Sequence, residues 1–209
     1  MNRENKKIKY FEAFRYRWIS EKIKEYKMYS TESLEEELKA LLSAAIEDKD
    51  KTKETNLFYI AMFFLNTSLY TRSYKYMLIA ADESLYINKP LSIRYWVPDF
   101  IKKDASLIRE ELIQNKAKLL DLSESEIEEG LRFVLKGYEG IIAVLWKKAV
   151  EKVLYSDIFK NKDIRQTPHI LVGEYMGELR KVEIEDRNIN LTGKKNRELG
   201  NYSSIEKTS

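Results

Sequence analysis

The chain has 209 residues, of which 44% are hydrophobic and 34% charged, and its 37 basic and 34 acidic side chains nearly cancel to a formal net charge of +3. This length is enough for one hydrophobic core, and near-neutrality argues against a polyanion as the main partner. The absence of cysteine excludes disulfides and thiolate metal sites, and seven glycines and three prolines are too few for the turns of an all-β fold.

Residues 4–28 have the spacing of an amphipathic helix, with Phe11, Phe14 and Trp18 on its apolar face. The opposite face is basic and carries Lys6, Lys9, Arg17, Lys24 and Lys27. Cations interleaved with aromatic residues suit a nucleic-acid backbone or an anionic membrane surface, but the simpler interpretation is the solvated face of a core helix. The acidic helix predicted over residues 31–48 supports this simpler interpretation, because it would neutralise the basic face in an antiparallel hairpin.

The stretch 57–87 is apolar on nearly all sides, which predicts a central helix or helix pair wrapped by its neighbours. Its first part, residues 57–70, would form about 21 Å of helix, less than the ~30 Å thickness of a bilayer core. No transmembrane segment is therefore expected. The N-terminal residues also lack the apolar region of a secretory signal, so a cytoplasmic location is expected.

Residues 89–100 form the least regular apolar segment and lie between helix-stopping prolines. A ligand groove in this chain would be lined by such a connection, and the predicted ligand-binding residues are Arg94, Tyr95, Trp96 and Asp99. The alternative is that the two aromatic residues pack the connection onto the core.

A further helix is predicted over residues 105–120, and the stretch 117–134 resembles a helix-turn-helix pattern. Four glutamates near the start of its second helix would repel DNA phosphates, so Ser123 and Glu126 are interpreted instead as a capping box. This box opens a long amphipathic helix whose apolar stripe runs from Ile127 to Val153 and which includes Gly137 and Gly140, where a close helix approach is expected. The wide apolar stripe of this helix indicates either core packing or a self-association face.

The C-terminal stretch 168–184 fits either a helix or a small hairpin, and the helix is favoured. The polar composition after residue 185 predicts a disordered tail. His169 is the only histidine, which excludes a multi-histidine metal site, and no nucleotide-binding or hydrolase motif is present. No cofactor, metal or catalytic residue is predicted, and an enzyme is not the favoured class.

These patterns together predict an all-α, single-domain bundle of about five to seven helices over residues 4–160, with an appended element over 161–184 and a tail over 185–209. The predicted function is a non-enzymatic, cytoplasmic protein-interaction or regulatory module that binds another protein, including its own copy. One alternative is a DNA-binding regulator that uses the basic helix 4–28 or the stretch 117–134. The other is a small-molecule-binding protein or enzyme with a site near Arg94–Asp99.

Overall fold

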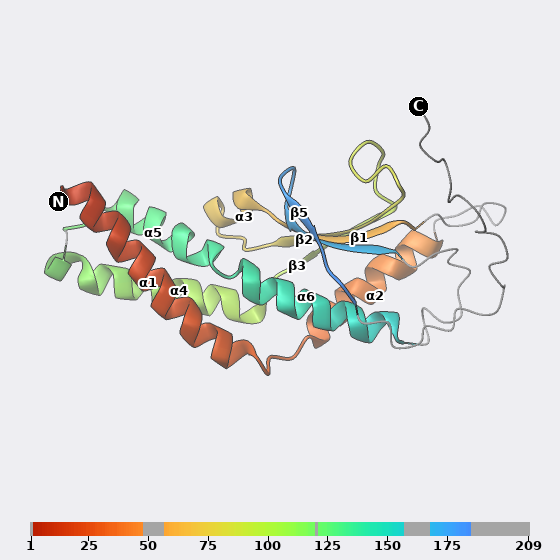
Figure 1. The fold of residues 1–209 in the computed structure, drawn as a ribbon, viewed down its shortest axis with the longest axis horizontal. Helices are drawn as coiled ribbons and strands as arrows, with labels where there is room; N and C mark the ends of the chain where they lie inside the picture. Colours follow the sequence, from red (N-terminus) through yellow and green to blue (C-terminus); the bar gives the residue numbers. More distant parts are fainter. Residues whose placement is uncertain (1, 48–56, 120, 157–167, 185–209) are drawn as a thin grey trace, which may run out of the picture.

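The protein, seen here as a computed structural model, combines a five-stranded sheet with helices (Figure 1). The structure describes residues 2–47, 57–119, 121–156 and 168–184. Its helices are α1 (Arg3–Tyr26), α2 (Glu32–Glu47), α3 (Asn66–Tyr70), α4 (Asp99–Leu119), α5 (Glu124–Lys136) and α6 (Glu139–Leu154). Its strands are β1 (Tyr59–Phe64), β2 (Tyr76–Ala81), β3 (Ser92–Trp96), β4 (His169–Glu174) and β5 (Leu179–Lys181).

The sheet has the strand order β3-β2-β1-β4-β5 and is mixed. Strands β1 and β4 run parallel, whereas the other three neighbouring pairs are antiparallel. The parallel pair lies at the centre of the sheet, and its partners are far apart in the sequence.

The predicted all-α bundle is wrong, because the central stretch 57–87 supplies the strands β1 and β2, joined through the short helix α3, rather than a central helix or helix pair. In β1, Ile60 and Met62 join the core under the helices, while Ala61 and Phe63 belong to a second apolar cluster on the opposite side of the sheet. A strand buried on both faces is continuously apolar, so its composition matches that of a buried helix.

The helix favoured for residues 168–184 is also wrong, since β4 and β5 form a hairpin there, whereas residues 161–167 of the appended element lie outside the described residues. This hairpin is part of the main sheet, because β4 pairs with β1 along its whole length. The hairpin pairing extends one residue past β5, where the Val182 amide donates to the Ile170 carbonyl at 2.8 Å. The predicted tail 185–209 lies outside the described residues, and the domain boundaries at residues 160 and 184 stay predictions.

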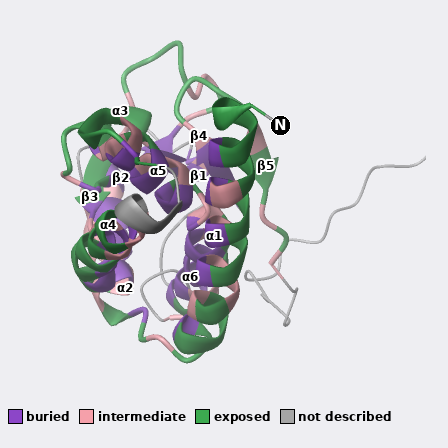
Figure 2. Cartoon of the chain, turned by 90° about the vertical axis from the view of Figure 1, so that its left-hand side faces the viewer, coloured by how far each residue is buried: buried purple, intermediate pink, exposed green. Residues whose placement is uncertain are grey.

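Helices α2 and α6 cover one side of the sheet (Figures 1 and 2). From α6, the Trp146 indole N–H donates to the Leu171 carbonyl of β4 at 3.1 Å, which ties the helix to the sheet. Helices α1, α4 and α5 extend beyond the end of the sheet and share its core through Phe11, Ile108 and Leu131. Among the described helices, none is long and apolar enough to cross a membrane.

A buried carboxylate joins α1, α4 and the start of α6. Asp104 is 1% exposed, and its Oδ2 accepts hydrogen bonds from the hydroxyls of Tyr26 and Tyr138, each at 2.6 Å. Its Oδ1 lies 3.0 Å from the Lys22 ammonium, and the Trp18 indole donates to the Tyr138 hydroxyl at 2.8 Å. Burial raises the pKa of both tyrosines well above the ordinary value, and the bond to Asp104 adds to it. The hydroxyls of Tyr26 and Tyr138 therefore stay protonated across the physiological range.

The predicted capping box is confirmed at the start of α5, where Ser123 and Glu126 exchange hydrogen bonds. The long helix predicted beyond it is divided into α5 and α6, because α5 ends at Lys136 and α6 begins at Glu139. A close approach exists at Gly137, where an added Cβ would lie 2.7 Å from Ile19 Cγ1, but Gly140 has open space around it.

Glycines in α5 and α6 give a matched pair of substitutions. A Cβ at Gly130 would lie 2.6 Å from the Phe11 ring, so Gly130→Ala is expected to lower the free energy of unfolding by about 1–2 kcal/mol through overpacking. At Gly140 nothing lies within 4 Å, so Gly140→Ala is expected to raise it by up to ~1 kcal/mol through helix propensity. Urea unfolding of both variants measures the difference, and equal effects would contradict the packing described at Gly130.

The Glu126 carboxyl is expected to stabilise the fold near neutral pH and to lose this effect at acidic pH. Its pKa is lowered well below the ordinary value, first by the hydrogen bond from Arg3 and then by the Ser123 amide. A carboxyl with a lowered folded-state pKa stabilises the fold above its unfolded pKa and loses this effect as the pH falls through its folded pKa. Glutamine can keep the capping box but loses the ion pair with Arg3, so Glu126→Gln should cost roughly 0.2–1 kcal/mol at pH 7 and progressively less below about pH 4.5. Urea midpoints measured from pH 7 to pH 3 test this, and a pH-independent loss would contradict it.

Candidate functional site

The side of the sheet that faces away from α2 and α6 carries two rows of mostly apolar residues, which we name the open sheet face. The strand pairings set its first row as Tyr95, Met77, Phe63, Gly173 and Leu179. Its second row is Ile93, Ile79, Ala61, Leu171 and Lys181. Among the described residues, no helix packs on this face, and only connecting segments lie over it (Figures 1 and 2).

Two connections shield the middle of the open sheet face. The Tyr86 ring of the 82–91 loop lies 5.7 Å from the Phe63 ring, and the Tyr175 ring of the β4–β5 turn lies 5.6 Å from it. The loop has its own hydrogen bonds, because Asp82 accepts from the Ser84 amide at 2.9 Å and Asn88 donates to the Ser84 hydroxyl at 3.1 Å. The shielding is therefore built from ordered loop residues rather than from an additional layer of helices.

Apolar side chains remain exposed around these connections. Three tyrosines, Tyr86, Tyr95 and Tyr175, are 41–50% exposed, and Ile87 is 89% exposed. Ile93 on β3 and Met176 in the turn are exposed as well. Exposed apolar patches are a common property of protein-binding sites.

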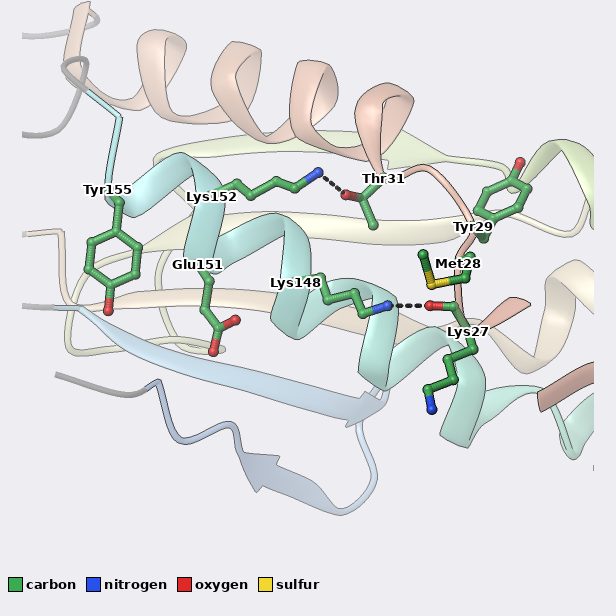
Figure 3. A pocket seen from close by; sticks show the side chains of 8 residues that line it. All are labelled: Lys27, Met28, Tyr29, Thr31, Lys148, Glu151, Lys152 and Tyr155. Atoms are coloured by element: carbon green, nitrogen blue, oxygen red, sulfur yellow. Dashed lines mark hydrogen bonds between the residues drawn. The ribbon is translucent and has the colours of Figure 1, made fainter. Parts of the chain in front are cut away.

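A second feature is a groove between the α1–α2 connection and the last turns of α6, which we name the α6 groove (Figure 3). Its volume is about 530 Å³, within the ~300–1,000 Å³ range of small-molecule pockets. The groove is lined by Lys27, Met28, Tyr29, Thr31, Lys148, Glu151, Lys152 and Tyr155.

Two lysines of α6 reach across the groove to the α1–α2 connection (Figure 3). The Lys148 ammonium donates to the Lys27 carbonyl at 2.7 Å, and the Lys152 ammonium donates to the Thr31 hydroxyl at 3.0 Å. Lys152 also pairs with Glu35 at 2.6 Å. Burial acts to raise the pKa of Glu35, but the bonds from Lys152 and Thr31 outweigh it and hold the pKa below its ordinary value. The ammonium groups of both lysines are therefore fixed in position.

The predicted ligand residues Arg94, Tyr95, Trp96 and Asp99 do not converge on one point. Successive strand residues face opposite sides of a sheet. Trp96 therefore points into the core between the sheet and the helices, and Tyr95 lies on the open sheet face. Trp96 is buried and its indole N–H donates to the Ser33 hydroxyl at 3.2 Å, while Arg94 and Asp99 are exposed. Only Tyr95 contributes to a candidate site described here, and ligand binding by the four together stays a prediction.

The basic residues predicted for nucleic-acid binding, Lys6, Lys9, Arg17, Lys24 and Lys27, are all exposed on α1 or at its end. Arg17 forms an ion pair with Glu111 of α4, which removes part of the positive charge. Lys27 lines the α6 groove. In the stretch 117–134, the carboxylates of Glu124, Glu126 and Glu128 pair with Arg109, Arg3 and Arg72.

The single histidine, His169, begins β4 and is exposed, with its ring 5.1 Å from that of Phe58. Within the described ranges, no group of three or more His, Asp or Glu side chains has the arrangement of a metal site. Nothing in the sequence patterns indicates Lys148 and Lys152 apart from their spacing of one helical turn. Tyr86 and Ile87 could not be predicted either, because nothing local marks a loop that folds over a sheet.

Comparisons of the chain with protein-family models, with curated proteins and with solved structures find no match. Its function must therefore be inferred from the open sheet face and the α6 groove themselves.

Proposed function

We propose that the protein is a protein-interaction module that associates with a second copy of itself through the open sheet face. The observation that carries this proposal is the set of exposed apolar side chains on the side of the sheet without a described helix layer. The interaction surface expected from the sequence was helical, whereas the surface proposed here belongs to strands and their connections.

The exposed area is of the size that a dimer requires. A tyrosine that is half exposed leaves roughly 100 Å² accessible, since aromatic side chains bury about 150–250 Å² when fully covered. With Ile87, Ile93 and Met176, the apolar part of the patch reaches on the order of 600 Å², close to the roughly 800 Å² that each partner contributes to a standard interface. The polar surroundings of the patch supply the remaining area.

The charges around the patch are of both signs, which suits a two-fold interface. In such an interface the same surface meets itself, so a rim of one sign would repel its copy and a mixed rim pairs with it. The 82–91 loop carries two acidic residues and one basic residue, and the Lys75 ammonium lies 5.8 Å from the centre of the Tyr95 ring. The rim residues are Lys75, Asp82, Glu83, Lys89, Glu178 and Lys181.

Sedimentation equilibrium over a series of protein concentrations tests this proposal. The unmodified chain should form dimers, and the double variant Ile87→Glu/Ile93→Glu should weaken the association about tenfold or more, because both carboxylates would be desolvated at the interface. The matched control is Val144→Glu, since Val144 is 54% exposed but belongs to α6. A chain that stays monomeric at all concentrations, or a control variant with the same loss, would contradict the proposal.

A further inference from the structure

We propose that the α6 groove binds a small aromatic molecule that carries a phosphate or carboxylate group. This site is separate from the open sheet face, because the groove lies between the α1–α2 connection and α6, on the helical side of the sheet (Figures 1 and 3). Three observations support the proposal: fixed ammonium groups, unbalanced positive charge, and aromatic residues at both ends of the groove.

The first observation is that the donors are already in place. Lys148 and Lys152 lie one turn apart on α6, and each side chain is held across the groove by an acceptor on the α1–α2 connection. An ammonium group has three N–H donors, so the single bond of Lys148 to the Lys27 carbonyl leaves donors for a ligand. Because these side chains are ordered beforehand, an anion that binds them avoids much of the entropy cost of fixing long lysine chains.

The second observation is the charge balance. Lys152 is paired with Glu35, and Glu151 lies 3.8 Å from the ammonium of Lys147. Among the described residues, no carboxylate lies within ion-pair distance of the ammonium groups of Lys27 or Lys148. Two cations at one groove without a protein counter-ion favour an anionic occupant, for which lysine acts as a point charge.

The third observation concerns the shape of the ligand. The groove volume of about 530 Å³ is much larger than a lone inorganic anion needs, so an organic portion must fill the rest. Tyr29 and Tyr155 stand at opposite ends of the groove, with Met28 beside Tyr29 (Figure 3). The Tyr29 ring also packs edge-on against the rings of Phe100 and Tyr26, 4.9 and 5.6 Å away, which holds it at the end of the groove. Aromatic and thioether side chains pack well against a flat ring, which is why we assign an aromatic anion to this groove.

Nuclear magnetic resonance titrations with phenyl phosphate and with benzoate test the proposal, with phenol as the neutral counterpart. A ligand of this size should bind with a dissociation constant of about 1 mM, and added salt should weaken the binding. The tighter of the two anions identifies the natural head group as phosphate or carboxylate. Phenol should bind more weakly than both, because it lacks the charge that Lys27 and Lys148 recognise.

Two variants and one control locate the binding. Lys27→Gln should weaken the binding of the preferred anion about tenfold, and the fold should tolerate it because the Lys27 contact to Lys148 is made by the main-chain carbonyl. Lys148→Gln should have a similar effect, whereas Lys148→Arg, which keeps the positive charge, should retain most of the affinity of the unmodified chain. Lys9→Gln is the matched control, since Lys9 is exposed on the same helix about 27 Å away. Absence of saturation by either anion at about 10 mM, or an equal loss in the Lys9 variant, would overturn the assignment.

Discussion

Asp104→Ala is expected to lower the free energy of unfolding by about 3–5 kcal/mol, the usual cost of removing one partner from a buried ion pair. The substitution leaves the Lys22 ammonium with only the exposed Glu25 as its counter-ion and removes the acceptor of the Tyr26 and Tyr138 hydroxyls. Each of these groups then loses a bond at a place where water has little access. The midpoint of thermal unfolding should fall by roughly 6–20 °C for a chain of this size.

Glu110→Ala is the matched control for Asp104→Ala, because Glu110 belongs to the same helix, α4, but is exposed. Its effect should stay within about 0.5 kcal/mol, as for most surface substitutions. Urea unfolding followed by circular dichroism measures both variants. An Asp104 variant as stable as the control would mean that the buried hydrogen bonds described here do not hold α1, α4 and α6 together.

The second large effect is expected at Gly173 in β4. An added Cβ at this position would lie 2.1 Å from the Glu178 carbonyl oxygen, which is a main-chain atom and cannot turn away as a side chain does. Gly173→Ala should therefore separate β4 from β5 and lower the free energy of unfolding by about 3 kcal/mol, the upper end for overpacking. The fluorescence of Trp146, which donates to the Leu171 carbonyl of β4, gives a local signal in addition to urea unfolding.

Gly177→Ala provides the comparison within the same hairpin. Its added Cβ would lie 2.9 Å from the Glu174 Cβ, which is a much milder clash than the 2.1 Å contact at Gly173. The loss should therefore be clearly smaller than at Gly173. If the two variants were equally stable, the close main-chain approach at Gly173 would be incorrect.

Local patterns predicted the surface helices well. The apolar spacing of residues 4–28 corresponds to α1, and the capping box of Ser123 and Glu126 begins α5 as expected. Both signals arise within a few residues of each other in the sequence, where side-chain spacing and backbone hydrogen bonds are directly linked. The residues that determine such a helix therefore all lie within one short stretch of the sequence.

The strands could not be predicted in the same way, because their identity depends on distant partners. Residues 59–64 are apolar on both sides, which fits a buried helix as well as a central strand, and only the pairing with β2 and β4 decides between them. The candidate sites share this difficulty. The α6 groove joins Lys27 to Lys148, and the parallel course of α1 beside α5 and α6 brings them together, as the contacts of Phe11 with Gly130 and of Ile19 with Gly137 show.

The placement of β4 between β1 and β5 has a consequence for synthesis on the ribosome. Strands β1, β2 and β3 can form an antiparallel sheet early, but one edge of β1 then waits while all of α4, α5 and α6 are made. Because an unpaired strand edge recruits any extended chain nearby, a nascent or truncated product that stops before His169 should be prone to aggregate.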